Sequence, residues 1–162
     1  TKVGFLFQSS ALYDSMSVRE NLLFPMRRNI SRLSEEEEEK RIMDALGSVG
    51  LTEAVDKMPD ELSGGMKKRV GLARTLILNP EIILYDEPTT GLDPVTSKEI
   101  SKLILSVQER YNTSSIVITH DKKCAEMTAN RILVLEEGVF TAEGTFKALS
   151  KSENPFVKAF FE

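Results

Sequence analysis

The chain has 162 residues, of which 41% are hydrophobic, which is enough for one domain with a real core. Its 21 basic residues stand against 25 acidic ones, and this net charge of −4 predicts no general affinity for nucleic acid. A single cysteine excludes a disulfide within the chain. We find no signal peptide and no apolar stretch of about 18 residues that could span a bilayer, so we expect a cytoplasmic protein.

An apolar run near the start predicts a buried strand, and a helix follows it. The run spans Val3 to Phe7 and ends at Gln8, and its lack of polar alternation is typical of a strand buried on both faces. Downstream, Ser17 and Glu20 form the pattern of a capping box, in which two side chains satisfy backbone donors at a helix start. We expect this helix to end near Phe24, because the proline that follows disfavours helical geometry in the residue before it.

Two more helices are predicted before the next strand. Ser34 and Glu37 form a second capping box, and the helix that they open should run to Val49. A third helix should follow Gly64 and close at Asn79-Pro80. Because these helices interrupt alternating strands and helices, we expect a helical subdomain inserted into an α/β core. We place the core at residues 1–8 and 76–150, the subdomain at 9–75 and a C-terminal helix at 151–162.

The second half of the chain alternates strands and helices. The apolar run from Ile82 to Tyr85 predicts a strand buried on both faces, and two carboxylates, Asp86 and Glu87, follow it directly. Asp93 and the proline after it then open a helix that should reach Tyr111. The remaining predicted elements are a strand over Ser115–Thr119, a short helix over Lys122–Ala129, a hairpin of strands over Arg131–Leu135 and Val139–Ala142, and a tail helix over Asn154–Phe161.

Polar residues stand where two of the predicted strands end. Ligands bind at the carboxyl ends of parallel strands, which places Asp86, Glu87 and His120 where chemistry would occur. Nucleotide hydrolysis needs a metal near the phosphates, a group that orients water, and groups that stabilise transition-state charge. Asp86 suits the metal, Glu87 suits a general base, and His120 could stabilise charge on a terminal phosphate. Each also has an ordinary alternative, because carboxylates at strand ends often cap loops and a lone histidine usually has no special role.

Two further features could contact the same nucleotide. Ser63-Gly64-Gly65 opens a helix, where free N–H groups and the helix dipole favour a phosphate and glycines let the backbone approach it. Gln8, at another strand end, could reach a metal ion or its water. Taken alone, Ser63 and Asp93 are equally well explained as helix caps, and Gln8 as a surface amide.

In this order, these residues resemble the motifs of the ATP-binding-cassette (ABC) ATPases. The resemblance rests on Gln8 as the Q-loop, Leu62–Met66 as the signature, Ile82–Glu87 as Walker B with the catalytic glutamate, Gly91–Asp93 as the D-loop, and His120 as the switch histidine. It covers essentially the whole chain. It implies an α/β fold of the P-loop NTPase (RecA-like) type with an inserted helical subdomain, and an ATPase that uses ATP and Mg²⁺.

The resemblance also implies roles and partners. Glu87 and His120 would be catalytic, Asp86 and Gln8 would contact Mg²⁺, and the nucleotide would be contacted by Gln8, Ser63, Gly64, Gly65 and Asp93. In the family, the signature residues act on ATP bound by the opposite subunit. The resemblance therefore implies a homodimer that sandwiches ATP and docks on a transmembrane permease subunit at the inner face of the cell membrane, without nucleic acid.

Two departures accompany the resemblance. Met66 stands where the family usually has glutamine and cannot donate the same amide hydrogen bond, but the serine and glycines before it are intact, so we expect tuning of the site. No G-x-x-x-x-G-K-[ST] phosphate loop occurs in the 162 residues, whereas the family carries one upstream of the Q-loop. We therefore expect a domain truncated at its N-terminus that does not hydrolyse ATP on its own.

The transported substrate is less sharply indicated. The segments Phe5–Leu12 and Val18–Asn21, together with Met66 and the ending Asn154–Val157, resemble the ATPases of Mce-associated lipid transporters. This implies transport of phospholipid or another lipid, although importers of amino acids and exporters of lipoproteins share most of these residues. Two other functions stay open, a catalytically silent truncated module that docks on a membrane partner and an ABC ATPase that acts on DNA or ribosomes. The acidic charge argues against the last.

The resemblance finally implies a strand order and a docking surface. The Gln8 strand should neighbour the Asp86 strand, which should neighbour the His120 strand, with the phosphate-loop strand next. Since that strand is not in the sequence, we expect the hairpin Arg131–Ala142 to be displaced, to pair directly with the His120 strand or to swap with another copy. We also expect a helix of the membrane subunit to dock on the surface formed by Leu12, Tyr13, Met16 and the helix Val18–Phe24.

Overall fold

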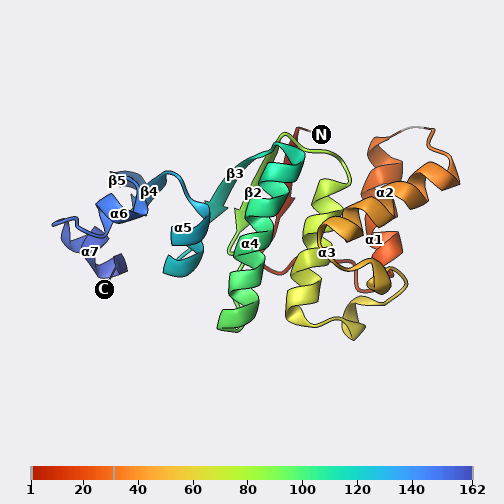
Figure 1. The fold of residues 1–162 in the computed structure, drawn as a ribbon, viewed down its shortest axis with the longest axis horizontal. Coiled ribbons are helices and arrows are strands. Elements are labelled where there is room, and N and C mark those ends of the chain that lie inside the picture. Colours follow the sequence, from red (N-terminus) through yellow and green to blue (C-terminus); the bar gives the residue numbers. More distant parts are fainter. Residues whose placement is uncertain (1, 31, 162) are drawn as a thin grey trace.

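A three-stranded parallel sheet lies at the centre of the computed structural model, which describes residues 2–30 and 32–161 (Figure 1). Its strands are β1 (Val3–Leu6), β2 (Ile82–Asp86) and β3 (Ser114–Ile118), in the order β1-β2-β3. Both pairings are parallel, so the three strands end at the same edge. The predicted order of the Gln8, Asp86 and His120 strands is therefore confirmed.

Three helices between β1 and β2 form a group beside this sheet. They are α1 (Val18–Asn29), α2 (Glu35–Ser48) and α3 (Gly64–Leu76), with two short 3₁₀ turns at Thr52–Ala54 and Pro59–Glu61. Both predicted capping boxes are present at the starts of α1 and α2. The division into core and inserted subdomain at the boundaries given above stays a prediction.

The first helix is longer than its proline predicts. It continues through Pro25 to Asn29, so the expected end near Phe24 is wrong. Proline removes one intrahelical hydrogen bond. In α1 this loss is outweighed by packing, because Leu22 and Met26 lie one turn apart and both are fully buried in the core.

The sheet is covered on one face only, within the part of the chain that the structure describes. Ile83 and Tyr85 of β2 are fully buried and belong to the same core cluster as residues of α3 and α4 (Pro94–Tyr111). On the other face, Phe5, Ile116 and Ile118 are exposed. The prediction that the runs Val3–Phe7 and Ile82–Tyr85 are buried on both faces is therefore wrong for the described chain, because Phe5 and Ile82 are exposed.

The C-terminal part begins with α5 (Lys122–Thr128) and continues with a hairpin of β4 (Ile132–Glu136) and β5 (Val139–Gly144). The hairpin forms a separate antiparallel sheet, so one of the three expected arrangements, direct pairing with β3, is not formed. Helix α5 packs against α4 and separates β3 from the hairpin along the chain. Figure 1 shows the hairpin, α6 (Phe146–Leu149) and α7 (Pro155–Phe161) at the opposite end of the molecule from α1 and α2. Exchange with another copy stays a prediction.

No helix among residues 2–30 and 32–161 is both long enough and apolar enough to cross a membrane.

Asn21 fixes the loop that joins β1 to α1. Its side chain is fully buried, and its Oδ1 accepts a hydrogen bond from the Tyr13 N–H at 2.9 Å. Its Nδ2 donates to the carbonyl oxygens of Tyr13, Met16 and Ser17 at 3.1, 3.0 and 3.0 Å. One amide therefore satisfies both a donor and acceptors of the loop, which no purely acidic side chain could do.

We predict that Asn21→Asp destabilises the fold by about 2 to 3 kcal/mol at neutral pH, because a buried carboxylate cannot donate to three carbonyl oxygens. Chemical denaturation measures the change. The matched control, Asn130→Asp, lies at an exposed position and should change the stability by less than about 0.5 kcal/mol. Equal stability of the two variants would contradict the role of Asn21.

Candidate functional site

The chain turns sharply where β2 ends. Glu87 follows the strand with a φ of +47°, in the left-handed region that residues with a side chain rarely adopt. Its N–H donates a hydrogen bond to the Ile118 carbonyl oxygen at 2.9 Å, which ties this turn to the end of β3. The turn thus holds the Glu87 side chain beside the residues that follow β3.

The Glu87 carboxylate is held from two sides. Its Oε1 lies 2.8 Å from Nδ1 of His120, and its Oε2 accepts a hydrogen bond from the Thr90 hydroxyl at 3.0 Å. The His120 side chain is 77% exposed, whereas that of Glu87 is 19% exposed. The hydrogen bond with Glu87, and then the charge of the same carboxylate, raise the pKa of His120 above its ordinary value of 6.5. With Nδ1 engaged, Nε2 of His120 is left for a further partner.

Gln8 and Asp86 stand at the same edge of the sheet. Gln8 lies two residues beyond β1 and is exposed, and Asp86 is the last residue of β2. No group of three acidic, histidine or cysteine side chains that could hold a metal occurs among the described residues. A carboxylate and an amide oxygen nevertheless fit Mg²⁺, which takes one or two protein oxygens and completes its shell with phosphate and water.

The signature residues open helix α3. Ser63 caps the helix, and its hydroxyl accepts a hydrogen bond from the Met66 N–H at 3.3 Å. A side chain at Gly65 would place its Cβ 2.6 Å from the Thr96 side chain, so only glycine lets α3 and α4 begin this close together. Gly64 remains exposed, with the first free N–H groups of the helix.

Asp93 opens the adjacent helix α4. Its carboxylate accepts hydrogen bonds from the N–H groups of Val95 and Thr96 at 2.9 and 3.1 Å. A hydrogen bond from the Thr96 hydroxyl, and then these backbone bonds, lower the pKa of Asp93. Ser63 and Asp93 are thus both helix caps, as their plainer interpretation predicts, and both stay exposed. The structure does not bring them against Glu87 or His120 by any described hydrogen bond or ion pair.

Lys68 is a residue of this site that the sequence interpretation missed. It lies on α3 and is buried, and its ammonium group contacts the carbonyl oxygens of Gln8 and Glu87. A signal for it existed in the sequence. Lys68 falls on the same helical face as Gly65, Leu72 and Leu76, and a charged side chain on such a buried face needs a polar partner.

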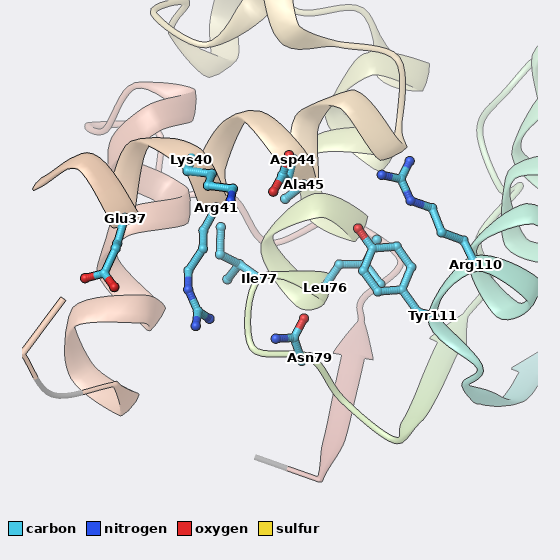
Figure 2. Close-up of a pocket in the computed structure, with 10 residues that line it drawn as sticks. All are labelled: Glu37, Lys40, Arg41, Asp44, Ala45, Leu76, Ile77, Asn79, Arg110 and Tyr111. Atoms are coloured by element: carbon cyan, nitrogen blue, oxygen red, sulfur yellow. The ribbon is translucent and has the colours of Figure 1, made fainter. Parts of the chain in front are cut away.

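A cavity of about 520 Å³ lies away from these residues, where α2 and the last turns of α3 and α4 meet. Figure 2 shows cationic side chains of α2 and α4 at its rim and the ring of Tyr111 facing into it. None of the predicted site residues lines it. The candidate site is therefore the strand-end edge together with the starts of α3 and α4.

Residues 1–90 match the family model described as ABC transporter. The chain belongs to this family. It is 39% identical to Protein TRIGALACTOSYLDIACYLGLYCEROL 3, chloroplastic, of Arabidopsis thaliana, over 98% of the chain and 50% of that relative. It is 38% identical to the methionine import ATP-binding protein MetN of Carboxydothermus hydrogenoformans, over 88% of the chain and 42% of that relative. The chain thus spans about half the length of these relatives.

A solved ABC cassette has the same fold. The dimeric structure of MJ0796 in a post-hydrolysis state, bound to ADP and Pi, is 34% identical to the chain and superposes with a TM-score of 0.78. The match covers 90% of the protein described here and 63% of the MJ0796 chain. The predicted α/β fold of the P-loop NTPase type is therefore confirmed.

We predict that His120 titrates with a pKa above 6.5 and that Glu87→Gln moves it towards 6.5, because a neutral amide stabilises the imidazolium less. The raised pKa means that the pair stabilises the fold fully below about pH 6.5 and less as pH rises through the raised value. NMR titration of the imidazole measures it, with the signal identified by its loss in His120→Gln. Glu109→Gln, at an exposed position on α4, is the control that should leave the midpoint unchanged.

Proposed function

We propose that the protein is the ATP-binding subunit of an ABC transporter and that it hydrolyses ATP with Glu87 and His120 as the catalytic pair. The observation that carries this proposal is the 2.8 Å contact between the Glu87 carboxylate and His120 Nδ1 at the carboxyl edge of the parallel sheet. ADP and Pi in the structure of MJ0796 support nucleotide hydrolysis as the reaction. The intact pair argues against a catalytically silent module.

Each residue at the strand ends has a distinct part in this proposal. Glu87 accepts a proton from the attacking water or orients it, while Thr90 and His120 hold the carboxylate in place. His120 Nε2 would contact the terminal phosphate of bound ATP. Asp86 and the Gln8 amide would hold Mg²⁺, which when bound neutralises charge on the phosphates.

A second copy completes the site in this proposal. Ser63, Gly64, Gly65 and Asp93 contact ATP bound by the partner across a dimer interface, so that two copies enclose two nucleotides. Two features support it. The start of α3 presents free N–H groups at the exposed Gly64, and MJ0796 is described as a dimer.

We propose lipid as the transported substrate, on narrower support. The name of the plant relative contains that of a galactolipid, and this relative matches 98% of the chain. The name of the bacterial relative refers instead to methionine import, at nearly the same identity. ATP hydrolysis would be coupled to transport in either case.

We predict that Glu87→Gln in the full-length protein keeps ATP affinity within about threefold but lowers turnover at least about 100-fold, because an amide cannot act as a base. Calorimetry gives the affinity and phosphate release gives the turnover. Glu109→Gln serves again as the control, with turnover unchanged. Wild-type turnover by Glu87→Gln would refute the catalytic role of this residue.

A permease helix is the proposed partner of the surface that follows Gln8. Tyr13 is 44% exposed and its ring packs on the edge of Phe24 at 5.1 Å between centroids. Met16, Leu23 and Phe24 line a hollow whose rim carries charged side chains of α1.

Val18 and Leu22 are fully buried and do not belong to this surface, which corrects the expectation that the whole first part of α1 docks. Docking here would hold the subunit at the inner face of the membrane.

We predict that Tyr13→Glu and Met16→Glu each weaken assembly with the permease at least about tenfold, since a charge would be buried against an apolar helix. Co-purification of the complex measures assembly, and thermal unfolding checks the fold. Leu105→Glu, at an exposed apolar position of α4, should leave assembly intact. If Tyr13→Glu and Met16→Glu unfold the protein, these side chains serve the fold and not the partner.

A further inference from the structure

We propose that Lys68 is a positioning residue for hydrolysis, which ties the main chain of Glu87 to Gln8 and to helix α3. This inference rests on the proposed function and adds a residue that lies outside the motifs recognised in the sequence. Lys68 contacts the main chain of Glu87, whereas the roles assigned from the motifs belong to side chains such as the Glu87 carboxylate.

The burial of Lys68 is the first step of the argument. Its exposed fraction is 5%, although a lysine is almost never buried without a partner. Burial lowers the pKa of its ammonium group, and the charges of Asp86 and Glu87 oppose this change. The cation therefore lies within electrostatic reach of both carboxylates at the end of β2. A charge in such a place needs hydrogen-bond acceptors.

The acceptors are two backbone carbonyl groups at the ends of neighbouring strands. Lys68 Nζ donates to the carbonyl oxygen of Gln8, beyond β1, and to that of Glu87, beyond β2, the latter at 3.2 Å. These contacts cross 60 and 19 residues of sequence. They engage only the main-chain oxygens and do not occupy the side chains of Gln8 and Glu87. One ammonium group thus joins the signature helix to both strand ends.

The conformation of Glu87 explains why this contact matters. Its φ of +47° is strained for a residue with a side chain, and such a conformation persists only where the surroundings hold it. The N–H is held by the Ile118 carbonyl, the carboxylate by Thr90 and His120, and the carbonyl by Lys68. Without Lys68 the carbonyl loses its donor, so the residue can relax and carry its carboxylate away from the position that catalysis requires.

The test is Lys68→Met in the full-length protein, because methionine fills similar space with no donor and no charge to bury. We expect kcat to fall at least about tenfold, with KM for ATP and ATP affinity within about threefold of wild type. Lys68→Gln keeps an N–H donor and should recover part of the loss. Lys67→Met, the neighbouring and more exposed lysine on the same helix, should leave kcat unchanged.

A second readout does not depend on turnover. If Lys68 positions Glu87, Lys68→Met weakens the contact with His120, and the pKa of His120 falls towards 6.5. Loss of a nearby positive charge by itself would move this pKa upward, so a downward shift reports lost positioning. Glu87 and Asp121 are the carboxylates that raise this pKa, and neither is altered in the variant.

Several results would overturn the inference. These are wild-type kcat in Lys68→Met, a rise in KM with unchanged kcat, or a His120 pKa that does not fall. A similar loss of thermal stability in Lys68→Met and Lys68→Gln, without recovery of kcat in the latter, would assign Lys68 to the fold alone. Failure of the proposed function looks different, because Glu87→Gln would then turn over like the wild type while the His120 readout still reports on Lys68.

Discussion

The parallel pairing of β2 with both of its neighbours is the constraint on which the candidate site depends. Leu84 lies opposite Phe5 on β1 and opposite Ile116 on β3, so the three strands run in step and end together. Burial of Ile83 and Tyr85 on one face fixes this register, since a slip by one residue would expose both side chains. Only in this register do the residues after each strand meet at one edge.

Helix α3 carries the signature residues at its start and contacts the strand-end edge through Lys68. The helix passes very close to β1, because a Cβ at Gly71 would lie 3.0 Å from the Leu6 side chain and 3.2 Å from the Ser10 carbonyl oxygen. That close approach brings Lys68 beneath the two strand ends. The same helix therefore presents Ser63 and Gly64 to the outside and an ammonium group to the inside of the site.

Several contacts converge on Glu87, whose backbone is left-handed. An exposed histidine contacts the side chain of this residue, and a buried lysine contacts its main chain. The left-handed backbone of Glu87 costs free energy, and the surrounding hydrogen bonds offset that cost. These contacts hold the Glu87 carboxylate at the carboxyl end of β2.

The sequence by itself determined the local elements and the family, because capping boxes, apolar runs and motif order are encoded by residues close to one another. The helix starts at Ser17, Ser34 and Asp93 are examples.

Only the tertiary structure decided that α1 continues through Pro25, since burial of Met26 outweighs a lost hydrogen bond. It alone decided where the hairpin lies and which face of the sheet is covered. The contacts of Glu87 with His120 and of Lys68 with Gln8 join residues 33 and 60 positions apart, and packing of distant elements, which no local pattern encodes, brings them together.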